Sequence, residues 1–95
     1  MATTSSLTFT EDSDNACWTC SYESQGPHMV QLIRSTVAAL SVAFGLGDND
    51  PSIVKTWASS NAPSNKVIQI EAPAGVQVTL TSYSEVDTAT LMYIE

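Results

Sequence analysis

The sequence predicts an all-β domain, either a two-sheet β-sandwich or a jelly roll of about eight short strands. Two observations predict it. Segments in which apolar and polar residues alternate recur along the chain every ten residues or so, and clusters of Gly, Pro, Asn and Asp separate them. The chain has 95 residues, of which 43% are hydrophobic, so it can close one modest core.

The N-terminal part of the chain contains a polar segment and two candidate strands. Residues 1–6 are small and polar, and we expect them to be flexible. A single sandwich domain is expected over residues 7–95, because no linker or internal repeat divides them. Its first two strands are predicted at Leu7–Thr10 and Ala16–Glu23.

The middle of the chain has two interpretations. Apolar residues at 29, 32, 33, 37, 40 and 44 fit an amphipathic helix, which would give an α+β fold with a helix over 29–44. The same stretch also fits two paired strands, Met29–Arg34 and Leu40–Leu46, joined by a loop through Ser35–Ala38. We favour the strands, because the flanking segments have β-character and local structure tends to agree with the global fold.

The C-terminal third alternates most clearly. Lys66–Glu71 and Val76–Ser82 are predicted to form a β-hairpin around the turn-forming residues 72–75. The hairpin is expected to point five apolar side chains at the core: Ile68, Ile70, Val76, Val78 and Leu80. Further strands are predicted at Ile53–Trp57 and Thr88–Ile94.

Charge and hydropathy exclude several classes of function. The net charge is −7, and the basic residues are Arg34, Lys55 and Lys66. Three scattered cations cannot replace the counterions of nucleic-acid phosphates or attach the protein to an anionic membrane. No apolar run is long enough for a membrane helix. The N-terminus lacks the features of a signal peptide, so we expect synthesis in a cytoplasm.

The stretch ACWTCSY contains both cysteines, Cys17 and Cys20, in a C-x-x-C spacing. Zinc needs about four ligands, and the inventory of Cys and His ends with His28. A redox pair belongs at the start of a helix, and the residues that follow are a poor start. In a strand the two side chains point to opposite faces, so we expect two reduced thiols, with Cys20 in the core beside Trp18 and Tyr22.

Other candidate chemistry is sparse. His28 is expected to be an exposed loop residue, since no nucleophile motif accompanies it. Two acidic groups could ligate calcium through loop oxygens. They are Glu11, Asp12 and Asp14 in one loop, and Asp48 and Asp50 in another. Both are more typical of solvated turns. Trp57 is the aromatic residue best placed to stack on a sugar. We therefore expect no catalytic residue, no cofactor and no metal site.

Three stretches resemble small β-sandwich proteins of tailed-phage virions, such as capsid decoration proteins and head-fibre modules. They are WTCSYESQG, MVQLIRSTVAALSVAFGLG and VIQIEAPAGVQVTLTSYSEVDTATLMYIE, which together cover most of residues 7–95. The resemblance lies in the arrangement of strands and turns. It implies a non-enzymatic protein that binds a capsid or tail lattice in multiple copies and is located in the virion.

The leading expectation is thus a structural virion component with protein partners, acting as a homo-oligomer, with no nucleic acid bound and no insertion into a membrane. The first alternative is a carbohydrate or host-surface binding module that uses Trp57. The second is an acidic intracellular inhibitor that occupies the basic groove of a nucleic-acid-binding protein.

Overall fold

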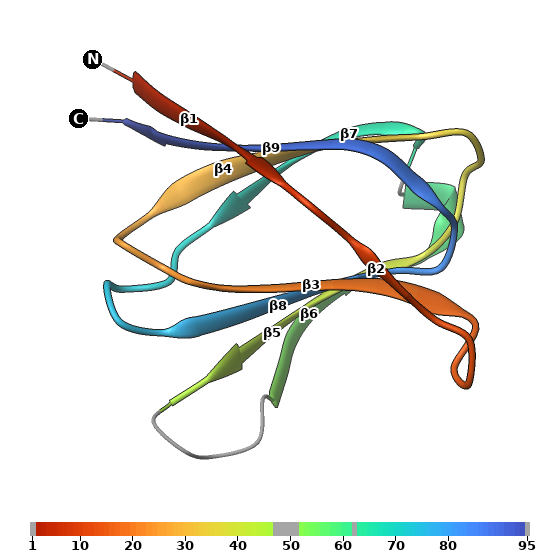
Figure 1. The fold of residues 1–95 in the computed structure, drawn as a ribbon, viewed down its shortest axis with the longest axis horizontal. Coiled ribbons are helices and arrows are strands. Elements are labelled where there is room, and N and C mark those ends of the chain that lie inside the picture. Colours follow the sequence, from red (N-terminus) through yellow and green to blue (C-terminus); the bar gives the residue numbers. More distant parts are fainter. Residues whose placement is uncertain (1, 47–51, 62, 95) are drawn as a thin grey trace.

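The protein is an all-β sandwich of two antiparallel sheets (Figure 1). The structure, a computed structural model, describes residues 2–46, 52–61 and 63–94. Sheet A has the strand order β1 (Ala2–Leu7), β9 (Val86–Ile94), β4 (His28–Arg34) and β7 (Asn65–Ile70). Sheet B has the order β2 (Thr10–Asp12), β3 (Cys17–Glu23), β8 (Gln77–Ser82), β5 (Leu40–Gly45) and β6 (Ser52–Trp57). The predicted fold class is confirmed.

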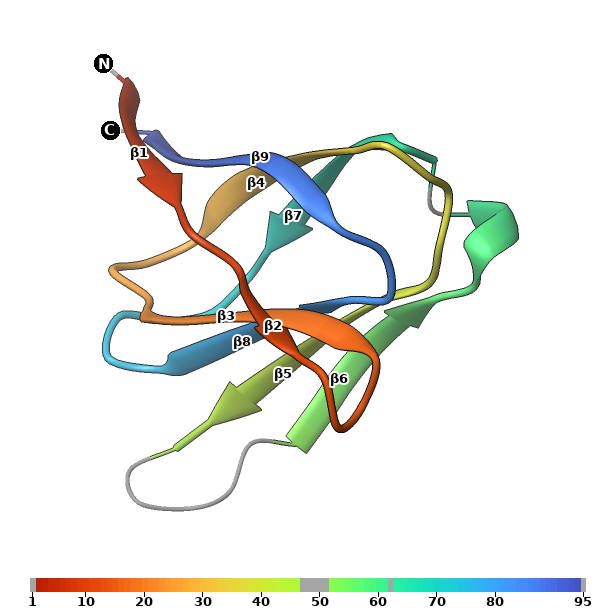
Figure 2. The same ribbon diagram turned by 45° about the vertical axis from the view of Figure 1, so that its right-hand side comes forward.

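Most connections cross from one sheet to the other. Only two consecutive pairs of described strands share a sheet, β2 with β3 and β5 with β6. The other consecutive strands lie in opposite sheets. With β2 set aside, the orders β1-β9-β4-β7 and β3-β8-β5-β6 are those of an eight-stranded jelly roll. Figure 2 shows the two layers from a second direction.

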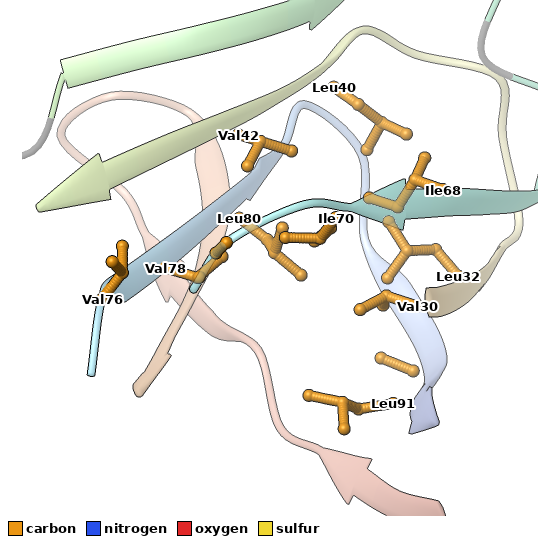
Figure 3. Close-up of a cluster of buried hydrophobic side chains, with 12 residues drawn as sticks. Val30, Leu32, Leu40, Val42, Ile68, Ile70, Val76, Val78, Leu80 and Leu91 are labelled. Carbon is orange, nitrogen blue, oxygen red and sulfur yellow. The ribbon is translucent and has the colours of Figure 1, made fainter. Parts of the chain in front are cut away.

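The core lies between the sheets, where strands β4, β5, β7, β8 and β9 contribute alternate side chains (Figure 3). Val30 and Leu32 of β4 face Val78 and Leu80 of β8, and all four are at most 1% exposed. The five side chains predicted to point inward from 68–80 are all buried, as predicted. The remaining members of the cluster are Leu40, Val42, Ala72, Ala89 and Leu91.

The helix alternative for residues 29–44 is wrong. The only helix among the described residues is a short 3-10 turn, η1 (Ser59–Asn61), and the stretch in question forms β4 and β5. The predicted pairing of these two strands is also wrong, because β4 pairs with β7 and β9 while β5 pairs with β6 and β8. Residues 35–39 therefore cross between the sheets.

The predicted C-terminal hairpin is likewise a connection between sheets. Strand β7 belongs to sheet A and β8 to sheet B, so they face each other across the core. The turn itself forms: the Val76 amide donates to the Pro73 carbonyl at 3.3 Å, and Gly75 has a φ of 92° that favours glycine. A turn of this length can join partners within a sheet or across a sandwich, so local residues could not distinguish them.

The N-terminus differs from expectation too. The segment expected to be flexible at 1–6 is strand β1 from Ala2 onward, because the edge of β9 offers it a full register of backbone partners from Ala2↔Ile94 to Leu7↔Ala89. The single strand predicted at Leu7–Thr10 is two strands in different sheets, β1 and β2, with Thr8 and Phe9 between them.

This crossing gives the sandwich two unlike sides. On one side the chain passes directly from β1 at the edge of sheet A to β2 at the edge of sheet B (Figure 1). On the other side the edges are β7 and β6, and they leave a groove between the sheets. No helix among the described residues is long and apolar enough to span a membrane.

Candidate functional site

The two cysteines lie on strand β3 and are free thiols. Cys20 is buried on the core side, as predicted. Cys17 is buried as well, at 4% exposure, although it lies at the start of the strand on the opposite face. Burial raises the pKa of both thiols, and the nearby carboxylate of Asp12 adds to the effect at Cys17. Both side chains are therefore placed as small structural residues.

His28 is buried at 4% exposure, so the expectation of an exposed loop residue is wrong. It begins β4 rather than ending a loop, and it shares the inward face with Val30 and Leu32. Its Nδ1 lies 2.8 Å from the Gly26 carbonyl oxygen, which can only accept. In the neutral ring Nε2 is then the acceptor, and the Tyr22 hydroxyl donates to it at 2.5 Å.

Tyr93 completes an aromatic cluster around His28. The His28 ring centroid lies 5.4 Å from that of Tyr22 and 4.9 Å from that of Tyr93. Burial raises the pKa of the Tyr22 hydroxyl well above its usual range, so it remains a protonated donor. The Tyr93 hydroxyl accepts from the Gln25 amide at 2.9 Å. The cluster joins the β3–β4 corner to β9.

Ser24 ties the same corner to the β7–β8 turn. Its amide donates to the Val76 carbonyl at 2.8 Å, and its own carbonyl accepts from the Gly75 amide at 2.9 Å. The buried hydroxyl lies 2.9 Å from both the Ala72 and the Gly26 carbonyl oxygens. Each polar atom named here at this end of the sandwich has a hydrogen-bond partner within the chain. These bonds stabilise the β3–β4 corner and the β7–β8 turn.

The acidic candidates do not come together as a metal site. Asp12 ends β2, and its Oδ2 accepts from Asn15 Nδ2 at 2.8 Å within the β2–β3 turn. Glu11 and Asp14 are exposed. Within residues 2–46, 52–61 and 63–94, no group of three His, Cys, Asp or Glu side chains could hold a metal ion. Asp48 and Asp50 lie outside the described residues.

Trp57 lies at the open side of the sandwich, where it lines a groove of about 260 Å³ between β6 and the end of β7. This Trp57 groove has an apolar part formed by Val42, Phe44, Val54, Trp57 and Ile70, and a polar rim formed by Lys55, Gln69 and Glu71. Trp57 and Lys55 pair with the inward residues Leu40 and Val42, so they lie on the inner side of β6. The expected sugar-stacking residue is therefore half-buried beside a hollow.

Two ammonium groups lie over the Trp57 ring. Lys55 Nζ is 5.2 Å from the ring centroid and Lys66 Nζ, from β7, is 5.9 Å away. These distances fit cation–π contacts. The third cation, Arg34, is only 3% exposed. Every basic group that reaches the surface of this acidic chain is thus at the Trp57 groove, a convergence that spacing in the sequence did not reveal.

Arg34 stabilises the opposite end of the sandwich. Its guanidinium donates from Nη1 to the Ala38 carbonyl at 2.9 Å and to Ser82 Oγ at 3.2 Å. From Nη2 it donates to the Pro63 carbonyl at 3.1 Å. Burial lowers the pKa of Arg34 from its usual value, because the charge is removed from water.

The paired outward positions of sheet A carry no charged side chain among the described residues, and the exposed Asp87 lies beside them at the irregularity of β9. Strand register aligns them in rows across β1, β9, β4 and β7. The row through the centre is Ser6, Thr90, Gln31 and Val67, and beside it lie Thr4, Met92, Met29 and Gln69, then Thr88, Ile33 and Asn65. Val67 is 55% exposed, and six of these residues, from all four strands, line a shallow hollow of about 230 Å³.

The outer face of sheet B is different, since small hydroxyl residues dominate it. One row across all five strands is Thr10, Thr19, Thr81, Ser41 and Thr56. In the next row Ser21 and Thr79 share a hydrogen bond of 3.0 Å between their hydroxyls. Thr79 and Thr81 point outward, as predicted for alternate positions of this strand. Ile53 of β6, at 65% exposure, is a large apolar side chain on this face, so the two outer faces differ in how many such side chains they carry.

Comparison with known proteins does not assign the chain to a family. No family model and no curated protein matches it. Two solved structures show a distant likeness at 11% identity and 90% coverage of this chain: Drosophila melanogaster CENP-C bound to CAL1 and the Drosophila melanogaster CENP-C cupin domain. The TM-scores are 0.28 and 0.27, with 73% and 72% of those chains covered. A likeness at this level carries no argument about function.

Proposed function

We propose that the protein is a non-enzymatic structural component of a phage virion, of the capsid-decoration, head-fibre or tail-associated type, that binds other virion proteins. The proposal starts from the resemblance of its strand and turn pattern to small virion sandwiches. The observation that carries it furthest is the outer face of sheet A, where large apolar side chains and neutral polar ones occupy the paired outward positions of all four strands.

This face has the composition of an interface core. Such cores are depleted of charged residues and enriched in methionine and other large apolar side chains. Met29, Met92, Ile33 and Val67 supply the apolar area here. Burying a surface that carries the carboxylates of this chain, whose net charge is −7, in a protein contact is costly, because an unpaired carboxylate loses its hydration there. A partner of matching chemistry is a virion protein that presents a neutral, apolar surface.

The fold alone does not decide between functions. Jelly rolls occur in viral capsid proteins, in lectins and in cupins. Function therefore has to be argued from surfaces rather than from topology.

Two measurements test the proposal. The first is whether the gene lies among capsid and tail genes. The second is co-sedimentation of the purified protein with virions of the phage that encodes it. Thr90→Lys places a charge at the centre of the sheet A face, and Thr79→Lys is the matched control on the outer face of sheet B.

We expect the wild type and Thr79→Lys to co-sediment with virions and Thr90→Lys to lose about tenfold or more in affinity, since a buried unpaired charge is costly. Absence of the wild-type protein from virions overturns the proposed function. Retention of Thr90→Lys with loss of Thr79→Lys overturns the choice of face, because the contact would then lie on sheet B.

The Trp57 groove favours carbohydrate or host-surface binding as a second candidate. An aromatic ring beside a hollow with polar rim groups is a common arrangement for recognising a sugar. Binding to a glycan array that is lost in Trp57→Ala, with co-sedimentation unchanged, supports it. The two lysines over the ring oppose a neutral sugar, because stacking on that face would displace them.

A further inference from the structure

The two edges of sheet B carry opposite charges. Strand β2 forms one edge, and with the turn that follows it presents Glu11, Asp12 and Asp14. Strand β6 forms the other edge and presents Lys55, while Lys66 of β7 lies over the same Trp57 ring. An edge strand also leaves one row of backbone donors and acceptors unpaired. Sheet B therefore has an acidic edge and a basic edge, with three strands between them.

The basic edge has features that favour binding of a carboxylate. Neither Lys55 nor Lys66 forms an ion pair with any residue that the structure describes, and both ammonium groups lie within 6 Å of one ring centroid. A carboxylate that approaches the ring gains from both ammonium groups. The apolar side chains beside them lower the local dielectric and strengthen such a contact. Glu71 on the rim subtracts one charge, so this edge is net positive by one.

The acidic hairpin of the same molecule cannot reach this groove. Strands β3, β8 and β5 separate β2 from β6, so the two edges lie on opposite sides of sheet B. Two copies of the chain can meet this way, since the charges of one edge complement those of the other. The rest of the surface repels a second copy, because the net charge is −7.

We propose that the Trp57 groove binds the acidic β2–β3 hairpin of a second copy of this chain, with Glu11 and Asp14 placed against Lys55 and Lys66. The inference deepens the proposed function and rests on it, because it states how copies of a structural protein would join. The two surfaces lie on opposite edges, so the contact is head to tail and the assembly is a ring or an open chain rather than a two-fold dimer.

Sedimentation velocity over a range of protein concentrations tests this contact. The wild type is expected to associate at low ionic strength and to dissociate as salt screens the charges. Lys55→Glu/Lys66→Glu and Glu11→Lys/Asp14→Lys should each be monomeric. Glu23→Lys/Glu85→Lys changes net charge as much as the second variant, but Glu23 lies at the far end of β3 from the β2–β3 turn and Glu85 precedes β9, so this variant should still associate. Glu71→Gln should associate more tightly than the wild type.

An equimolar mixture of the two charge-reversed variants is the decisive arm. Each variant keeps one native surface and carries one reversed surface. In the mixture the native groove of one variant meets the native hairpin of the other, and the reversed groove meets the reversed hairpin. Both contacts join opposite charges, so association should return. A wild type that stays monomeric at all concentrations overturns the inference. Association of both charge-reversed variants on their own also overturns it. A mixture that stays monomeric, although circular dichroism shows both variants to be folded, overturns it as well.

The two proposals fail separately. Loss of self-association with virion co-sedimentation intact removes only the head-to-tail contact. Self-association that persists while the wild type does not bind virions removes the virion role and leaves the contact standing.

Discussion

The hydroxyl of Tyr22 donates a hydrogen bond of 2.5 Å to Nε2 of His28, and the two residues come from strands in opposite sheets. Tyr22 lies on β3 in sheet B and His28 on β4 in sheet A. The contact therefore crosses the sandwich at its end and connects the sheets by a polar link beside an apolar core. Its partners are half-buried and buried, so the bond is shielded from competing water.

Tyr22→Phe should destabilise the protein at neutral pH by about 1–3 kcal/mol, because it leaves a buried acceptor on His28 without its donor. Urea unfolding followed by fluorescence measures this change. Tyr83→Phe is the matched control, since Tyr83 is 50% exposed, and it should be close to neutral. Equal effects of both substitutions would contradict a role for the Tyr22–His28 bond.

Stability should fall in alkaline solution. The pKa of folded Tyr22 is raised, so its contribution is fully present below the pKa of an unfolded tyrosine, which is about 10. Above that pH the unfolded state loses a proton that the folded state keeps, and the free energy of unfolding decreases. Urea midpoints measured from neutral to strongly alkaline pH test this. Tyr22→Phe should show a smaller alkaline loss than the wild type.

The cysteines should be reduced and slow to react. Burial raises the pKa of both thiols, so little thiolate is present near neutral pH. Thiol titration without reductant should count two free thiols after denaturation and react slowly before it. Because both are buried, Cys17→Ser and Cys20→Ser should each destabilise by about 1–3 kcal/mol unless the new hydroxyl finds a partner. A count of zero in monomeric protein would contradict the strand placement.

Arg34→Met should destabilise the sandwich by about 2 kcal/mol or more, because three acceptors lose a charged donor in a buried site. Arg34→Lys should restore only part of the loss, since one ammonium group cannot span the positions that the guanidinium reaches. Thermal unfolding of the three proteins tests the order. A lysine variant as stable as the wild type would show that charge alone suffices there.

Leu80→Ala should cost about 2–5 kcal/mol, because Leu80 is 1% exposed and its removal leaves a cavity between the sheets. Thr79→Ala, one position along the same strand and facing outward, should stay within about 0.5 kcal/mol of the wild type. Chemical denaturation of both variants measures the contrast. Similar losses would mean that the register of β8 is different.

Alternation in the sequence was enough to predict most of the strands and, in the C-terminal third, the side chains that point inward. Alternation is a local property, so the inward positions of β7 and β8 could be predicted before any partner strand was known. The same rule applied to HMVQLIR would have placed His28 and Arg34 on the face of Val30 and Leu32, although neither was singled out for burial. Only the assumption that polar residues lie outside prevented that prediction.

Which strands pair could be read only from the tertiary structure. The loop predicted at 35–38 and the turn predicted at 72–75 do not close hairpins within one sheet, because both carry the chain across the core. A strand buries the same apolar area whether the next strand pairs with it in one sheet or packs opposite it in the other sheet. Which of the two arrangements forms therefore depends on how both sheets close together. The gathering of Lys55 and Lys66 over Trp57 follows from that choice, because it sets β6 beside β7 at the open side.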